Sequence, residues 1–102
     1  MTTTKLIDSS AASATSDVIQ PPRSRDEKGL WQSNIAVTGG GATLVLQGRT
    51  APAAPWHVIV SETFSDMGTN ATNVESVDIF PEMRAVLTGN NTSVAVKGWL
   101  AD

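Results

Sequence analysis

The sequence predicts an all-β protein, a small antiparallel β-sandwich of Ig-like or jelly-roll-like type that follows an extended N-terminal arm. From Gly29 onward, apolar residues recur with a period of two, which is the pattern of strands with one buried face. Turns rich in Gly, Pro and Asn separate these runs, and no segment has the 3.6-residue apolar period of a helix. At 102 residues the chain has room for one domain with one modest core.

Six strands are predicted from this alternation, and the part of the chain before Gly29 leaves room for one or two more. Their ranges are residues 30–37, 42–49, 56–61, 74–80, 82–88 and 93–100. We therefore divide the chain into an arm or linker at residues 1–28 and a β-sandwich domain at residues 29–102.

The alternation also assigns side chains to faces of the sheets. In the strand from residue 56, it places Trp56, Val58 and Val60 together on one face, toward the core. In the next predicted strand, the apolar phase shifts between Val74 and Val77, which indicates a β-bulge.

Pro81 opens the stretch "PEMRAVLT". Because proline lacks the N–H that a β-ladder needs, this residue is predicted to lie at the first position of a strand or on an edge strand. Met83, Ala85 and Leu87 are expected to point inward, and Glu82 and Arg84 outward. An exposed pair of that kind adds only about 0 to 1 kcal/mol to stability. Glu82 and Arg84 therefore gain importance only if a partner removes them from water, and we take both as candidate partner-binding residues.

The first 28 residues have a different composition from the rest. Residues 1–17 are mostly Ser, Thr and Ala, which is too little apolar surface to offset a backbone ordering cost of about 1 to 2 kcal/mol per residue. Two interpretations remain open: a disordered tail, or an arm that becomes ordered in grooves of a neighbouring protein. The arm residues that would make those contacts are Leu6, Ile7, Val18 and Ile19.

Charge and composition exclude several classes of protein. The net charge is −3, and the arm is neutral, so the sandwich carries the whole excess of acid and direct binding of nucleic acid is not expected. There is no cysteine, hence no disulfide and no thiolate metal site. No apolar run approaches the roughly 18 to 20 residues of a membrane span, and the N-terminus lacks the pattern of a secretion signal.

No catalytic constellation is visible, and we expect no catalytic residue, no cofactor and no enzyme activity. His57 is the single histidine and lies in the polar phase of its strand, without a nucleophile and acid at a suitable spacing. The triple glycine at residues 39–41 leads into a strand and lacks the Lys-Ser/Thr of a phosphate-binding loop. It is interpreted as a hairpin connection.

Two polar patterns have alternative interpretations. An oxygen-rich run could hold calcium, but its spacing does not match the twelve-residue calcium loop, and we expect no metal site. Its members are Asp66, Asn70, Asn73, Glu75 and Asp78. Three Asn-X-Ser/Thr sequences match the N-glycosylation pattern and are interpreted as turn chemistry instead. They begin at Asn70, Asn90 and Asn91.

The three tryptophans receive different interpretations. Trp31 and Trp56 share a face with aliphatic residues, and both are expected in the core. Trp99 is out of phase with Val96 and Leu100, and it is therefore a candidate contact residue in a subunit interface or against another protein. A platform of tryptophans that stacks on sugars is the alternative.

Three stretches resemble a family of small virion proteins of tailed bacteriophages and prophages: "GGGATLVLQGRTAPAAPWHVI", "VDIFPEMRAVLTG" and "SVAVKGWLAD". In that family a Gly-rich turn leads into a strand, a Trp opens the next strand, and a Phe-Pro-Glu-Met-Arg-like strand and a closing hairpin follow. The resemblance covers about residues 35–102. It implies no catalytic residue.

Similar proteins are β-sandwich components of the particle, often decoration or cement subunits on the capsid surface. The resemblance therefore implies a protein that is made in the host bacterial cytoplasm and binds the assembled major capsid protein. A homo-oligomer, a trimer or a dimer, is expected with it. The alternatives are a neck, tail or head-fibre component of the virion, or a glycan-binding sandwich.

Overall fold

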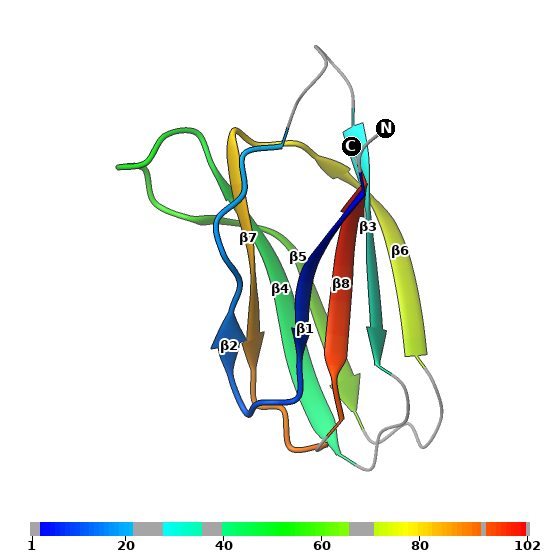
Figure 1. Ribbon diagram of the computed structural model, residues 1–102. Helices are drawn as coiled ribbons and strands as arrows, with labels where there is room; N and C mark the ends of the chain where they lie inside the picture. Colours follow the sequence, from blue (N-terminus) through cyan, green and yellow to red (C-terminus); the bar gives the residue numbers. More distant parts are fainter. Residues whose placement is uncertain (1–2, 22–27, 36–39, 66–70, 93, 102) are drawn as a thin grey trace.

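The computed structural model describes residues 3–21, 28–35, 40–65, 71–92 and 94–101, which form two stacked antiparallel sheets and no helix (Figure 1). The predicted all-β sandwich is confirmed. Its eight strands are β1 (Thr3–Ser9), β2 (Ala14–Thr15), β3 (Lys28–Ile35), β4 (Gly41–Arg49), β5 (His57–Ser65), β6 (Ala71–Asp78), β7 (Glu82–Thr88) and β8 (Val96–Ala101).

Each sheet has four strands. The order in the first sheet is β1-β8-β3-β6, and the order in the second sheet is β2-β7-β4-β5. Strands β1 and β2 thus form one lateral edge of the sandwich, and β5 and β6 form the other (Figure 1). The strands β8, β3, β7 and β4 lie inside their sheets, with a neighbouring strand on each side.

The core lies between the sheets and follows the predicted alternation. Met83, Ala85 and Leu87 of β7 point inward, as expected, and meet the inward side chains of the first sheet. Trp31 of β3 is fully buried, and its ring leans over Gly98 of β8, where a Cβ atom would overlap the indole. The other fully buried large apolar side chains are Ile35, Leu44, Leu46, Val96 and Leu100.

The N-terminal segment is part of the sandwich, so the predicted boundary at residue 29 does not separate an arm from the fold. Strand β1 pairs along β8, and its register skips Leu6, because Lys5 pairs with Trp99 and Ile7 with Gly98. This bulge lets two consecutive apolar side chains point inward. Leu6 is 8% exposed and Ile7 is 5% exposed, so both are packed inside their own chain.

The chain after β2 continues along β7. The backbone N–H of Ile19 donates to the Met83 carbonyl at 2.9 Å, and the N–H of Met83 donates to the Ile19 carbonyl at 3.0 Å. Ile19 is partly buried against the core. Val18, at 44% exposed, is the one member of the expected arm contacts that the structure leaves at the surface.

A bulge in β5 changes which residues face the core. Leu46 of β4 pairs with Val60, and the next residue, Gln47, pairs with Val58, so Ile59 is an extra residue. The alternation therefore resets at Ile59. Val60 is buried, whereas Val58 is 49% exposed, and the prediction that they share a face with Trp56 toward the core is wrong.

The bulge predicted between Val74 and Val77 is absent. Strand β6 pairs with β3 without a break from Lys28↔Asp78 to Ile35↔Ala71. Val74 is exposed on the outer face and Val77 is buried, so the shifted apolar phase comes from one apolar residue on the solvent side.

The connection between β7 and β8 is made by turn residues, as the sequence indicates. Gly89 has φ of 62°, which favours glycine. The buried Asn90 side chain accepts bonds from the Thr92 N–H at 3.1 Å and the Thr92 hydroxyl at 2.6 Å. The side-chain Oδ1 of Asn91 accepts from the Gly41 N–H at 2.6 Å. The turn interpretation of the pattern at Asn90 and Asn91 is confirmed, while Asn70 lies outside the described residues.

The burial of Leu6 and Ile7 predicts that they stabilise the isolated protein without any partner. We expect Leu6→Ala or Ile7→Ala to lower the free energy of unfolding by about 2 to 5 kcal/mol, since each removes buried apolar volume. Val18→Ala is the matched control and should change it by less than about 0.5 kcal/mol. Denaturant unfolding of the purified variants gives the comparison, and equal effects at positions 6 and 18 would contradict the assignment of β1 to the core.

Candidate functional site

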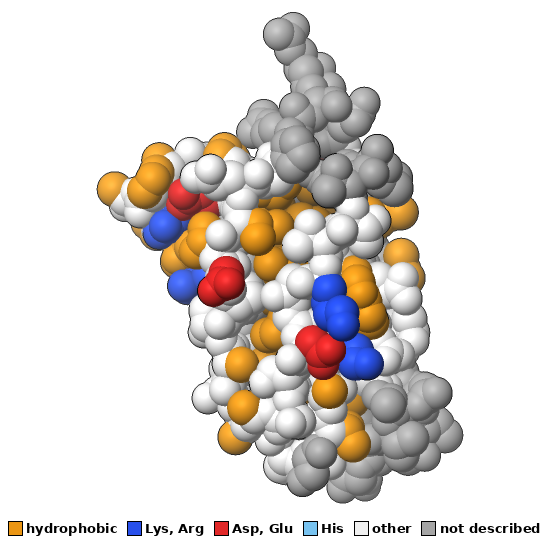
Figure 2. All heavy atoms as spheres, in the orientation of Figure 1, with side chains coloured by type: hydrophobic (Ala, Val, Ile, Leu, Met, Phe, Trp, Pro, Cys, Tyr) orange, Lys and Arg blue, Asp and Glu red, His pale blue; other side chains and the backbone are white. Residues whose placement is uncertain are grey.

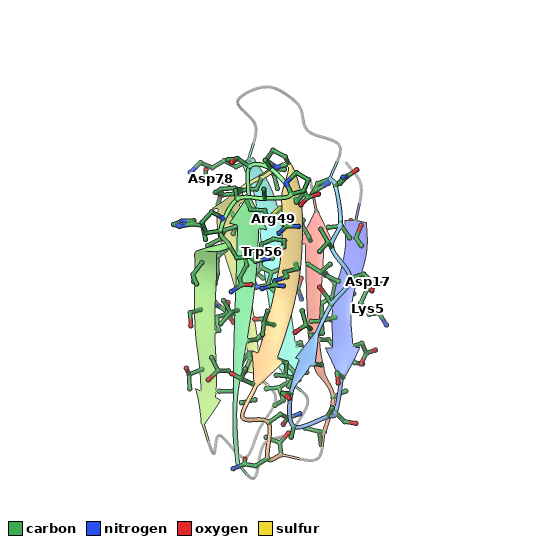
Figure 3. The ribbon with its side chains drawn as sticks, turned by 90° about the vertical axis from the view of Figure 1, so that its left-hand side faces the viewer. Lys5, Asp17, Arg49, Trp56 and Asp78 are labelled. Carbon is green, nitrogen blue, oxygen red and sulfur yellow. The ribbon has the colours of Figure 1, made fainter. Side chains whose placement is uncertain are left out.

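The outer face of the second sheet carries a group of polar side chains around one tryptophan, here named the Trp56 cluster. Its members are Gln47, Arg49, Trp56, Glu82 and Arg84. They come from β4, β7 and the residue before β5, and the strand register places Gln47 opposite Arg84 and Arg49 opposite Glu82. Figure 3 shows Arg49 and Trp56 close together near one end of this face.

Two arginines lie against the same indole ring. The Cζ atoms of Arg49 and Arg84 are each 4.2 Å from the centroid of the Trp56 ring. A guanidinium group over an indole gains about 0.5 to 2 kcal/mol, depending on exposure. Trp56 is thus a partly exposed residue of the outer face, and the expectation that it belongs to the core is wrong.

Glu82 is the anion of the cluster. Its carboxylate accepts from Nε of Arg49 at 2.7 Å and from Nε2 of Gln20 at 3.4 Å, and the residue is only 8% exposed. The hydrogen bond from Arg49 lowers the pKa of Glu82 below its ordinary value, against the opposing effect of burial. Glu82 therefore points outward as predicted, but it is covered and paired with Arg49 instead of forming an exposed pair with Arg84.

Arg84 has a neutral partner. Its Nε donates to Oε1 of Gln47 at 2.8 Å. Within the described residues, the ion pairs join Lys5 to Asp8, Lys28 to Asp78 and Arg49 to Glu82, so no carboxylate there pairs with Arg84. Asp17 lies toward β1, well to the side of Trp56 (Figure 3). The Arg49–Glu82 pair is internally neutral, and among the described residues the positive charge of Arg84 has no carboxylate partner.

Trp99 lies on the outer face of the first sheet. As its phase predicted, it is partly exposed while its neighbour Leu100 is buried. It pairs with Lys5 of β1 and Gln32 of β3, and Gln32 in turn pairs with the exposed Val74 of β6. Figure 2 shows basic, acidic and hydrophobic side chains adjacent to one another over β1 and β8. This face combines an aromatic residue with aliphatic and charged neighbours.

A buried polar group links the two sheets near the β5–β6 edge. Glu62 of β5 points inward and is buried, and its carboxylate accepts hydrogen bonds from the Ser33 hydroxyl and from Nδ2 of Asn73, the latter at 2.6 Å. An inward-pointing charge on an edge strand disfavours pairing with a foreign strand, because a partner would have to bury it further. The sequence carried a signal for it, since Glu62 shares the phase of Val60 and Phe64.

The weaker candidates for chemistry have structural partners. The His57 ring stacks on Phe80, with centroids 5.8 Å apart and an interplanar angle of 30°. Of the oxygen-rich run, Asn73 donates to Glu75 at 2.9 Å, and Asp78 pairs with Lys28 at 3.6 Å. Asp66 and Asn70 lie outside the described residues, and so does Gly39 of the triple glycine. No group of three metal-ligating side chains occurs in the part of the chain that the structure describes.

Comparison with known proteins identifies no family: no family model, no curated protein and no solved structure matches the chain. The described residues also contain no helix long and apolar enough to cross a membrane.

The sequence marks two of the five members of the Trp56 cluster as candidate contacts, Glu82 and Arg84. It does not mark Trp56, because the run from Trp56 to Val60 alternates without interruption and nothing in it identifies Ile59 as an extra residue. Arg49 alternates with Leu44 and Leu46 in the sequence, which fits an outward position, but the sequence does not show that Trp56 lies beside it.

The lowered pKa of Glu82 predicts a pH-dependent contribution to stability. Bonds to the carboxylate stabilise the fold fully above its ordinary pKa of 4.5, and this contribution is lost as pH falls through the lower folded-state pKa. The loss of unfolding free energy caused by Glu82→Gln should therefore be largest near neutral pH and shrink below pH 4.5.

Denaturant unfolding of wild type and variant, from about pH 3 to about pH 7, tests this prediction. The exposed Asp17→Asn serves as the matched control for removing one carboxylate. A difference between wild type and Glu82→Gln that stays constant over the whole range would contradict it.

Proposed function

We propose that this protein is a structural component of a phage virion, a decoration or cement protein that binds and stabilises the assembled shell of major capsid protein. The resemblance of residues 35–102 to small virion proteins supports the proposal. The observation that carries it is the pair of outer faces, each with a partly exposed tryptophan among charged side chains, on one sandwich. Tryptophan and arginine are the residue types that most often dominate binding energy in protein interfaces.

A rigid body with a contact residue on each sheet can bridge two neighbours at once. Trp99 lies on the outer face of the first sheet, and Trp56 and Arg84 lie on that of the second. A protein that contacts one shell subunit through each sheet would hold the two subunits together. They could separate only if one of the two contacts broke. Because Leu6 and Ile7 are buried in the sandwich, the contacts are assigned to its faces and to Val18. A homo-oligomer on a symmetry axis of the shell remains part of the proposal.

A neck, tail or head-fibre subunit is the alternative within the virion, and the copy number per purified particle separates the two. Hundreds of copies indicate decoration, and a dozen or fewer indicate the neck or tail. Capture of glycans is a second candidate, because both partly exposed tryptophans could stack on sugar faces. Sugars would then change the tryptophan fluorescence, whereas the decoration function predicts no change.

Addition of the protein to undecorated capsids tests the proposal. We expect bound protein to raise the temperature of capsid rupture, and Trp99→Ala to weaken capsid binding by at least about tenfold, as loss of an aromatic contact at an interface does. Ser76→Ala, on the same sheet face, is the control and should bind like wild type. Absence of binding together with an unchanged rupture temperature would exclude this function.

A further inference from the structure

We infer that the Trp56 cluster is a binding site for a carboxylate, the side chain of Asp or Glu on an exposed segment of a partner protein. The inference rests on the proposed function in one respect, that the partner is a protein. It adds the chemistry of the contact and the residues that make it, with Arg84 as the charged contact and Trp56 as the surface beside it.

Charge complementarity is the first argument. The two guanidinium carbons are at most twice 4.2 Å apart, because each lies 4.2 Å from the same ring centroid. Glu82 compensates Arg49, but no carboxylate among the described residues compensates Arg84. An incoming carboxylate would pair with the charge of Arg84 and so supply the kind of partner that Arg49 already has in Glu82.

The geometry of the arginines is the second argument. The Nε of Arg84 is engaged by Gln47, and the Nε of Arg49 is engaged by Glu82. Each guanidinium is thereby fixed through one atom, while its terminal Nη atoms make no hydrogen bond to another described residue. A fixed arginine fork binds a carboxylate through two parallel hydrogen bonds and loses less side-chain entropy than a mobile one.

The surroundings of the cluster favour a protein segment over a free anion. Val58 is 49% exposed and pairs with Gln47, so an apolar side chain borders the charged site. Trp56 itself is partly exposed. An acidic residue with an apolar neighbour would contact both the arginine and this apolar border, which a small inorganic ion cannot do.

Nucleic acid fits the site less well. Binding of a phosphate backbone requires several clustered cations. Judged by the residues that the structure describes, the cluster offers one arginine without a carboxylate partner, on a protein of net charge −3. A single carboxylate requires only one such arginine.

The experiment uses the full chain and the blocked peptide acetyl-Gly-Val-Glu-Val-Gly-amide, with the Gln-containing peptide as its counterpart. Binding is followed through the indole N–H signal of Trp56 in nuclear magnetic resonance spectra at low salt. Wild type, Arg84→Gln, Arg84→Lys and the control Lys97→Gln are compared, the last of which removes one positive charge from the other sheet. Thermal unfolding confirms that each variant is folded.

We expect the Glu peptide to shift the Trp56 signal and the Gln peptide to leave it unchanged. Arg84→Gln should weaken peptide binding by at least about tenfold, since it removes a charged hydrogen bond. Arg84→Lys should recover part of the affinity, and Lys97→Gln should bind like wild type. Equal binding of the two peptides, equal binding by Arg84→Gln and wild type, or a shift confined to Trp99 would overturn the inference.

Two further probes distinguish the source of the anion. A thymidine oligonucleotide or glucuronate that binds at Arg84 more tightly than the Glu peptide would also overturn the inference.

The capsid assay separates the carboxylate contact from the proposed function. If wild type fails to bind capsids, the proposed function fails, whatever the peptide shows. If wild type and Arg84→Gln bind capsids equally well, the carboxylate contact fails and the proposed function stands.

Discussion

The extra residue in β5, Ile59, is the constraint on which both the core and the Trp56 cluster depend. Before it, Trp56 and Val58 face outward, and after it Val60 faces inward, because the pairing with β4 skips one position. A strand without the bulge would place all three on one side of the sheet. If that side were the core, Trp56 could not contact the two arginines. If it were the outer face, the core would lose the side chains that close its β5 edge.

The cluster gains its rigidity from the strands that carry it. Strands β4 and β7 are each paired on both sides, and they hold Arg49 opposite Glu82 and Gln47 opposite Arg84. Each arginine is therefore fixed by a neighbour on the adjacent strand before any partner arrives. Sites built on paired strands hold their geometry better than sites on loops. Trp99 is held in a similar way, because β8 pairs with β1 on one side and with β3 on the other.

The sequence predicted what depends on regular alternation and missed what depends on its interruption. The inward phase of β7 and the outward phase of Trp99 were both visible, because each follows from a local pattern. The burial of Leu6 and Ile7 was not, since a bulge turns two consecutive residues inward and so hides the period of a strand. Trp56 was assigned to the core for the opposite reason: its alternation with Val60 looks regular although the pairing is not.

Because the chain contains no cysteine, the bulge in β5 can be tested directly by thiol labelling. Single cysteines introduced as Val58→Cys and Val60→Cys would report which face each position occupies, through their rate of reaction with a thiol reagent under native conditions. We expect fast labelling at position 58 and strong protection at position 60, because Val58 is 49% exposed and Val60 is 7% exposed. Equal labelling rates at the two positions would mean that the alternation runs on through Ile59, and would contradict both the bulge and the outward position of Trp56.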